Sequence, residues 1–290
     1  MSFEIFMQTI VNGLFTGSIY ALVAVGLTLI YGVMVIVNFA HGEFLMLGIY
    51  IAYWMFTLFG IDPYLSIPIA AVAIFAVGAL IQVGLVQRVL DAHPLNQIVL
   101  LVGVSILLMG LVQFFWSAEP KAIHVAYETE VIPLWGLRFS IPRMVAFFSA
   151  MIISLGLYLF LRFTKTGSAI RAVSQSRNGA MLMGIDVKYI YYLTFGIGAA
   201  VTAVGGVLLA PNHKMIPTMG QAYGVTAFVV VVLGTMGNFI GAFLGGLIIG
   251  VVEAFAGFWL GGDVKIIASM LIFILILLFK PAGLFGGKAA

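Results

Sequence analysis

Three side chains near the start of the chain could form an interhelical hydrogen-bond network or line a solute pathway. Asn38, His41 and Glu43 fall within six consecutive positions of an otherwise apolar stretch, and Gly42 precedes the glutamate. Such side chains mostly face a helix-bundle interior or a water-filled cavity. Gly42 would let a helix break here, which is tolerated where the break is buried in protein or lines a cavity. The pattern predicts an interhelical hydrogen-bond network close to a solute pathway.

A second polar interruption follows in the last third of the chain. Pro217 and Gly220, with Thr218 between them, predict a loop that re-enters a helix around Gln221. Two such interruptions, one in each half of a chain, indicate a transport site. We therefore expect the translocation pathway or a helix break at these positions: Asn38, His41, Gly42, Glu43, Pro217, Thr218, Gly220, Gln221 and Glu253.

Glu253 is the last of these residues and follows a glycine-rich stretch. Gly246 and Gly250 have the spacing that lets helix backbones approach closely in a membrane, so they predict packing rather than chemistry. Glu253 itself is either a cavity-facing acid or an interfacial residue near a helix end. The sequence leaves both interpretations open.

The composition indicates that these residues are positioned by membrane helices. Of the 290 residues, 63% are hydrophobic and 8% are charged, whereas about 25% are charged in soluble domains. We predict an all-α, polytopic membrane helix bundle that forms a single transmembrane domain over residues 1–290, with the lipid bilayer as its solvent. The first charge is Glu4 with no basic segment before it, so the first apolar segment is expected to remain in the membrane.

Charged residues mark the expected ends of the helices, because they are costly at mid-bilayer. A span needs about 20 apolar residues, and four charge-free runs fit one span each: 63–87, 92–118, 144–161 and 189–213. Runs 5–42 and 215–252 would each be about 57 Å long as one helix, so each must contain a turn. We expect these turns near Tyr31-Gly32 and near 234–238, and a last helix at 264–280. The total is eight or nine membrane segments.

The distribution of Lys and Arg predicts the orientation, since cytoplasmic loops carry the excess of these residues. If 163–187 is cytoplasmic and the spans alternate, eight basic residues lie inside: Arg88, Arg162, Lys165, Arg171, Arg177, Lys188, Lys280 and Lys288. Five lie outside: Lys121, Arg138, Arg143, Lys214 and Lys265. The N-terminus is then outside and the C-terminus cytoplasmic. Segment 118–142 becomes an extracytoplasmic cap or short hairpin, or a docking surface for an external partner.

The cytoplasmic loop at about 163–187 reads as two short helices joined near Arg177-Asn178-Gly179. Ile170 and Val173 belong to an interrupted apolar face, while Arg171 and Gln175 make other positions polar. The loop is either an ordinary basic loop that fixes orientation or a coupling helix that fits a groove on a soluble partner.

Sequence signals for an enzyme are absent. No phosphate-binding G-x-x-x-x-G-K-[ST] motif and no H-E-x-x-H motif occurs, and the four histidines fall in separate segments. The chain has no cysteine, which excludes disulfides and thiolate metal sites. Its net charge of +3 is small and scattered, which argues against nucleic-acid binding. We expect no catalytic site, no metal and no cofactor.

Several motifs are similar to those of a known family: Asn38-Phe39-Ala40-His41-Gly42-Glu43, the preceding Gly26–Gly32, the Gly167–Ile185 loop, Pro217-x-x-Gly220 and Val232–Gly237. Thr235 stands where that family's pattern has glycine. Through these motifs, and over nearly its whole length, the chain resembles the LivH-type permease subunits of bacterial ABC importers for branched-chain amino acids. The resemblance implies an inner-membrane permease that moves solute by alternating access.

The resemblance also implies partners: a homologous second permease subunit, two ATP-binding subunits that hydrolyse ATP, and a periplasmic substrate-binding protein. ATPase coupling is then expected at Gly167, Ala169, Arg171, Ala172, Gln175, Ala180, Gly184 and Ile185. Two other hypotheses remain at this point. One is a stand-alone ion-coupled carrier that uses Glu43 and Glu253, and the other is a membrane scaffold without a pathway.

Overall fold

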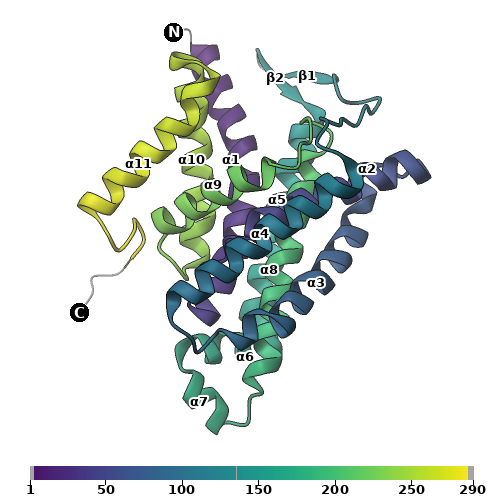
Figure 1. Ribbon diagram of the computed structural model, residues 1–290. Helices are drawn as coiled ribbons and strands as arrows, with labels where there is room; N and C mark the ends of the chain where they lie inside the picture. The colour runs from purple at the N-terminus through teal and green to yellow at the C-terminus, as the bar shows by residue number, and fades with distance from the viewer. Residues whose placement is uncertain (1–2, 135, 287–290) are drawn as a thin grey trace.

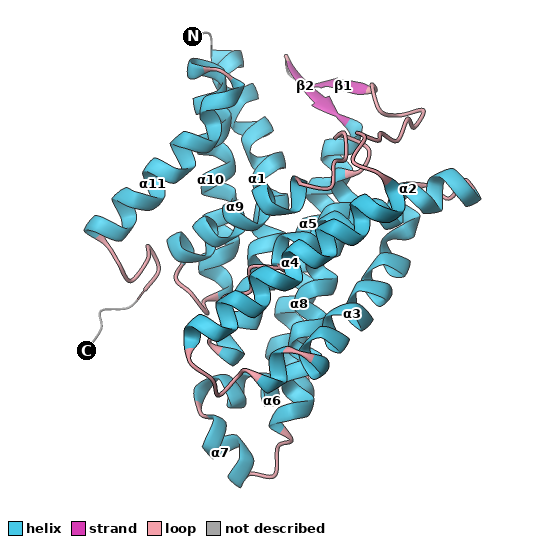
Figure 2. Ribbon diagram, in the orientation of Figure 1, coloured by secondary structure: helices cyan, strands magenta, loops and turns pink. Residues whose placement is uncertain are grey.

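The computed structural model describes residues 3–134 and 136–286, and these form a bundle of apolar helices with one small hairpin (Figures 1 and 2). Seven helices are long and apolar enough to cross a membrane: α1 (Phe3–Met34), α2 (His41–Phe59), α3 (Ile67–Gly84), α4 (Pro94–Trp116), α5 (Ile141–Phe163), α8 (Val187–Leu209) and α10 (Phe239–Leu260). The polytopic helical fold is thereby confirmed.

Two further apolar helices are shorter, α9 (Met219–Gly234) and α11 (Lys265–Phe279). The expected eight or nine membrane segments are therefore not confirmed, since the described residues contain seven full-length helices and the shorter pair must be counted to reach nine. The remaining elements are α6 (Lys165–Gln175), α7 (Arg177–Leu182), the 3₁₀ turns Pro63–Ser66, Val86–Arg88 and Gly262–Val264, and strands β1 (Val131–Leu134) and β2 (Leu137–Ser140).

Helix α1 forms the centre of the bundle, and its residues are buried over most of its length. It packs against α10, α8, α5 and α9. The contact with α10 is backbone to backbone: a Cβ at Gly250 would collide with Gly17, and one at Gly246 would collide with Ala21. The glycines thus serve helix packing, as their spacing predicts, because helices in lipid associate through close van der Waals contact.

The first expected turn lies a few residues later than predicted. Gly32 remains helical and packs against Gly237 in the turn between α9 and α10, so it permits close approach of that turn rather than forming a turn itself. The helix ends at Met34, and Val35 takes a φ of 57° in the left-handed region. The second turn is confirmed between α9 and α10, where the Asn238 side chain accepts a hydrogen bond of 3.0 Å from the Gly241 amide.

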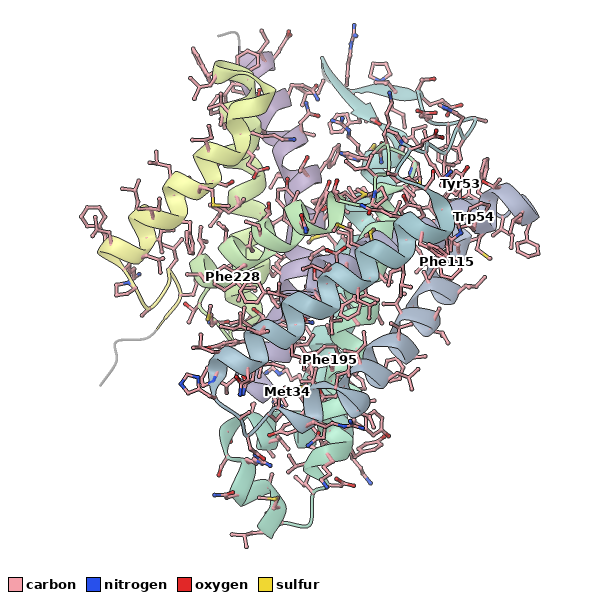
Figure 3. The ribbon with its side chains drawn as sticks, in the orientation of Figure 1. Met34, Tyr53, Trp54, Phe115, Phe195 and Phe228 are labelled. Atoms are coloured by element: carbon pink, nitrogen blue, oxygen red, sulfur yellow. The ribbon has the colours of Figure 1, made fainter. Side chains whose placement is uncertain are left out.

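The two ends of the bundle differ in structure. The β1–β2 hairpin lies at the same end as the start of α1, and α6 and α7 project from the opposite end (Figure 1). Near the hairpin end, aromatic side chains gather where α2 meets the end of α4, including Tyr53, Trp54 and Phe115 (Figure 3). Such belts are typical of a membrane–water interface. The hairpin that the sequence offered as one reading of 118–142 is present.

Candidate functional site

Helix α2 begins deep inside the bundle. The His41 ring nitrogen Nε2 lies 3.0 Å from the carbonyl oxygen of Val23, which is eleven residues before the end of α1. At 1.5 Å per residue, Val23 lies about 16 Å along the helix axis from the end of α1. Residues 35–40 therefore run back along the bundle without helical structure before α2 starts. Irregular backbone at such depth is found where it is buried in protein or lines a cavity.

His41 fixes this helix start to the neighbouring helices. Its Nε2 also lies 2.7 Å from the hydroxyl oxygen of Thr202 on α8, and that hydroxyl donates to the Gly198 carbonyl at 2.9 Å. Because Val23 offers only a carbonyl oxygen, Nε2 must carry a proton and donate. His41 is 1% exposed and joins α1, α2 and α8. Its surroundings match the hydrogen-bond network that the sequence suggested.

Gly42 brings α2 into backbone contact with α9. A Cβ at Gly42 would collide with the carbonyl oxygen of Gly220 and lie too close to the amide of Gly224. Gly220 is the second residue of α9, so the N-terminal ends of two helices meet here. The partial positive charges of both helix starts converge at this point.

Glu43 occupies the junction between these helix starts. It is 1% exposed, and its Oε1 accepts a hydrogen bond of 2.9 Å from the Ser105 hydroxyl on α4. Its Oε2 lies against Gly220, where any Cβ would collide with it. Within the part of the chain that the structure describes, Oε2 has no hydrogen-bond partner. Glu43 therefore connects α2, α4 and α9 through one carboxyl group.

A cavity of about 370 Å³ opens beside this junction. Asn38, Ser105 and Gln221 supply its polar wall, and its apolar wall includes Leu27, Val102, Ile106 and Phe228. Phe228 lies on α9, away from the α2–α4 aromatic cluster (Figure 3). The Asn38 Oδ1 accepts from the Ala40 amide at 3.1 Å, and its Nδ2 is buried without a partner among the described residues. The cavity can hydrogen-bond polar groups and contact an aliphatic side chain together.

Pro217 and Thr218 lie in the approach to α9 rather than in the cavity wall. Pro217 is buried, and Thr218 is the residue before the helix, whose side chain makes no capping bond. Just before them, Met215 exchanges two backbone hydrogen bonds with Lys121, of 3.0 and 2.8 Å. This bridge fastens the start of α9 to the segment that leads into the hairpin.

Glu253 is not brought to this cavity. Its Oε2 accepts a hydrogen bond of 2.7 Å from Tyr20 on α1, and Ser269 on α11 also bonds its carboxyl group. It lines a separate cavity of about 270 Å³ together with Thr9 and Lys265. The residue is 4% exposed and holds α1, α10 and α11 together. Of the two open interpretations, the cavity-facing acid describes its position.

We expect Glu253→Gln to retain near wild-type solute uptake, because the amide oxygen can still accept from Tyr20. Glu253→Leu should lower the free energy of unfolding by ~1–3 kcal/mol, since the buried Tyr20 hydroxyl then loses its acceptor. Thermal unfolding in detergent and uptake by reconstituted transporter measure the two effects. Loss of uptake in a well-folded Glu253→Gln variant would contradict the separation of this cavity from the pathway.

The loop between α5 and α8 forms two helices, as the sequence predicts. The break falls at Ser176, whose hydroxyl caps α7 by accepting from the Gly179 amide at 3.0 Å. The expected coupling residues divide into two groups. Gly167 and Ala180 are buried, and Ala169, Ala172 and Ile185 are half-buried. Arg171, Gln175 and Gly184 are exposed.

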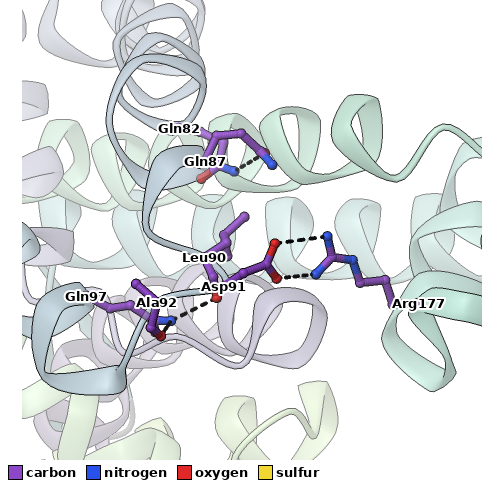
Figure 4. Close-up of polar contacts among 7 residues, drawn as sticks. All are labelled: Gln82, Gln87, Leu90, Asp91, Ala92, Gln97 and Arg177. Atoms are coloured by element: carbon purple, nitrogen blue, oxygen red, sulfur yellow. Dashed lines mark hydrogen bonds and ion pairs between the residues drawn. The ribbon is translucent and has the colours of Figure 1, made fainter.

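The tip of α7 is the most exposed apolar surface of this loop. Met181, Leu182 and Met183 are 48%, 89% and 82% exposed. Arg177, at the start of α7, pairs with Asp91 in the loop before α4, with Nη1 2.5 Å from Oδ1 (Figure 4). Hydrogen bonds and charge from Arg177 hold the pKa of the Asp91 carboxyl below its ordinary value, so the pair is formed at neutral pH.

Sequence reasoning missed several residues that complete these sites. Ser105 was the only hydroxyl in the apolar stretch 94–116, a signal that could have drawn attention to it. Thr202 and Tyr20 carry no such signal, because hydroxyl side chains are common in membrane helices. Asp91 is the lone acid between two spans, but nothing local predicts its partner 86 residues away.

Comparison with known proteins gives a consistent result. The model of the family described as branched-chain amino acid transport system / permease component matches residues 9–279. The high-affinity branched-chain amino acid transport system permease protein BraD of Pseudomonas aeruginosa is 35% identical, covering 97% of this chain and 96% of its own. LivH of Escherichia coli K12 is 33% identical, covering 98% and 96%.

More distant similarity is partial or limited to the fold. The ribose import permease protein RbsC of Bacillus subtilis is 29% identical over 101 residues, which is 32% of this chain and 31% of that protein. Among solved structures, PsaBC from Streptococcus pneumoniae in complex with Fab matches with a TM-score of 0.51 and 11% identity, covering 97% of this chain and 94% of that one. At that identity the match indicates a shared fold alone.

Proposed function

Because this chain belongs to the family of permease components of branched-chain amino acid transport systems, we propose that it is one of two membrane subunits of an ATP-driven importer. Its cargo is branched-chain or related amino acids. The chain is not an enzyme, and separate subunits hydrolyse the ATP. The stand-alone ion-coupled carrier finds no support among the relatives. Residues 1–290 act as a single transmembrane permease domain.

The observation that carries the proposal is the cavity lined by Asn38, Ser105 and Gln221. Three polar side chains stand there beside Phe228 and other apolar groups, which suits a small amino acid with an aliphatic side chain. Glu43 and Gly42 hold the two helix starts that form its inner wall. Pro217, Thr218 and Gly220 set the position at which α9 begins.

A homologous second permease subunit covers the open side of this cavity. Helix α4, which supplies Ser105, exposes a row of large apolar side chains at Val99, Val102 and Ile106. A polar cavity on such a face must be closed by protein rather than by lipid tails, because unpaired polar groups are costly in hydrocarbon. The amino acid would pass between the two subunits.

Two ATP-binding subunits dock on α6 and α7, one for each permease. The exposed Met181, Leu182 and Met183 fit an apolar groove on such a partner, and the same loop exposes Arg171, Gln175 and Gly184. The buried and half-buried residues of this loop hold the docking helices in position. They are Gly167, Ala169, Ala172, Ala180 and Ile185. Movement of α7 reaches α4 through the Arg177–Asp91 pair and the short loop before Pro94.

A periplasmic substrate-binding protein delivers the amino acid at the opposite end, on the hairpin and segment 118–142. This segment is well anchored, since the Tyr127 hydroxyl donates to Asp62 at 2.6 Å. The excess of Lys and Arg around α6 and α7 supports a topology with the N-terminus outside and the C-terminus in the cytoplasm. The protein then resides in the bacterial inner membrane, which it crosses several times.

The decisive test is uptake by the complete transporter in proteoliposomes. This chain, its second permease and the ATP-binding subunits are expected to accumulate leucine only when ATP and the binding protein are both present. The chain reconstituted alone should show no uptake under a sodium or proton gradient. Gradient-driven uptake by the isolated chain would instead support a carrier. Full uptake without the ATP-binding subunits would overturn the proposal.

We expect Arg177→Ala to lower uptake severalfold while ATP hydrolysis continues, because α7 is no longer tied to the loop before α4. Stability should change little, since an ion pair exposed to solvent contributes little to the free energy of unfolding. Uptake per ATP hydrolysed is the quantity to measure. The charge-swapped double variant Arg177→Asp with Asp91→Arg is the control and should recover part of the coupling. Equal uptake per ATP in wild type and Arg177→Ala would refute the proposal that the Arg177–Asp91 pair transmits movement from α7 to α4.

A further inference from the structure

We propose that the membrane face between α5 and α10 binds an anionic phospholipid, with an acyl chain in an apolar groove and the phosphate beside Arg162. This site lies apart from the transport cavity, since no residue lines both. The proposal depends on the membrane location of the chain but not on the identity of its cargo.

The groove itself is apolar and open. It encloses about 460 Å³ between the middle of α5 and the start of α10, and its principal lining residues are Met151, Ile152, Leu155, Tyr158, Phe239 and Phe243. Ile152 and Leu155 are 69% and 58% exposed, so side chains of this chain do not fill it. Hydrocarbon of a lipid tail matches such a surface.

A basic pocket of about 320 Å³ continues from the groove toward the end of α5. Tyr158 and Phe239 line both spaces, and their rings lie 5.8 Å apart. Arg162, Arg171 and Ser174 add charge and a hydroxyl to the pocket. An apolar groove that leads into a basic pocket reproduces the order of tail and headgroup in a phospholipid.

A hydrogen bond and two aromatic rings hold the Arg162 side chain at this position. Its Nη1 donates to the Tyr158 hydroxyl at 2.9 Å, and its guanidinium lies over the Tyr158 and Phe163 rings at 5.9 and 5.4 Å. The Arg171 Nη2 donates to the Arg162 carbonyl at 3.2 Å, which keeps the second guanidinium at the same wall. Less side-chain freedom is then lost when an anion binds.

No carboxylate neutralises this pair of arginines among the described residues, whose recorded ion pairs are His124–Glu128 and Arg177–Asp91. The opposite wall adds further positive potential, because Phe239 is the first residue of α10 and Gly237 lies in the turn just before it. The pocket therefore favours an anion. Basic pockets between membrane helices on the cytoplasmic side bind anionic headgroups in this way.

The pocket also has the right depth for a headgroup. Arg162 is in the last turn of the span α5, and Phe239 is the first residue of the span α10. Both helices thus reach the same membrane surface here. The apolar groove extends from this surface toward the middle of the bilayer, as a lipid tail does.

The test uses the assembled transporter in phosphatidylcholine vesicles that carry a trace of photoreactive lipid. Photoreactive phosphatidylglycerol is compared with photoreactive phosphatidylcholine bearing the same acyl chain, and labelled peptides are mapped. We expect phosphatidylglycerol to label 151–158 and 239–243 preferentially. Arg162→Gln should reduce this labelling by about fivefold, the factor expected for one basic side chain.

Two further variants make the result specific. Arg138→Gln removes an exposed arginine from the hairpin at the other end and should leave labelling unchanged. Leu155→Trp occupies the groove and should reduce labelling by both lipids. Equal labelling by the two lipids, or labelling that is insensitive to Arg162→Gln, would overturn the proposal. Absence of lipid labelling with crosslinks from this groove to the second permease would also overturn it.

Discussion

Gly42→Ala is expected to abolish most solute uptake and to destabilise the protein strongly. The added Cβ would collide with the Gly220 carbonyl oxygen, and that atom belongs to backbone rather than to a side chain that can rotate away. Helices α2 and α9 must then separate, at a cost near the upper end of the ~1–3 kcal/mol typical of overpacking. Thermal unfolding in detergent and ATP-driven uptake of leucine measure the two losses.

Gly156→Ala is the matched control for this experiment. Gly156 is also a helical glycine, on α5, but no atom lies within 4 Å of its hypothetical Cβ. The control should keep full uptake and be neutral or slightly more stable, because alanine favours helix more than glycine does. If both variants behave alike, close approach of α2 and α9 is not required for folding or transport.

Glu43→Ala is expected to lower uptake at least about tenfold while the ATP-binding subunits still assemble with the permease. The substitution removes the acceptor of the Ser105 hydroxyl and the group that joins α2, α4 and α9. Leaving a buried polar group without its hydrogen-bond partner costs ~1–3 kcal/mol, and the upper part of this range is enough for such a loss in rate if the bond shapes the pathway. Uptake and co-purification of the subunits are the measurements.

Glu43→Gln separates two roles of this side chain. The amide retains the shape and one oxygen, so recovery of uptake would assign to Glu43 the positioning of helices. Continued loss would assign the function to the carboxyl group itself. Ser105→Ala should reproduce part of the Glu43→Ala defect, since it removes the same hydrogen bond from the other side. Wild-type uptake in Glu43→Ala would refute a necessary role.

Much of the helical architecture could be predicted because charge is so costly in a bilayer. The over-long run 215–252 had to turn, and the glycines and Asn238 at 234–238 marked where. The run 5–42 also had to turn, but Gly32 was a misleading signal. A glycine can form a turn or allow another segment to pack closely against a helix, and only the position of Gly237 in space distinguishes the two.

The candidate site was predictable in part. Asn38, Glu43 and Gln221 stood out as polar groups in apolar runs, and the structure brings them to one junction. Glu253 stood out by the same criterion and lies in another cavity. The difference arises from which face of α10 meets α1, and tertiary packing decides that face. Ser105 completes the site from a helix whose own sequence is almost uniformly apolar.

The two backbone hydrogen bonds between Lys121 and Met215 have a mechanical consequence. They join the segment before the hairpin to the residues that enter α9, so backbone hydrogen bonds tie the two stretches together. A force on the hairpin end would therefore reach the Gly42–Gly220 junction along a few residues of backbone, without passing through the helix core. The permease thus has a short mechanical link at its hairpin end, opposite the longer one formed by α7 and Asp91.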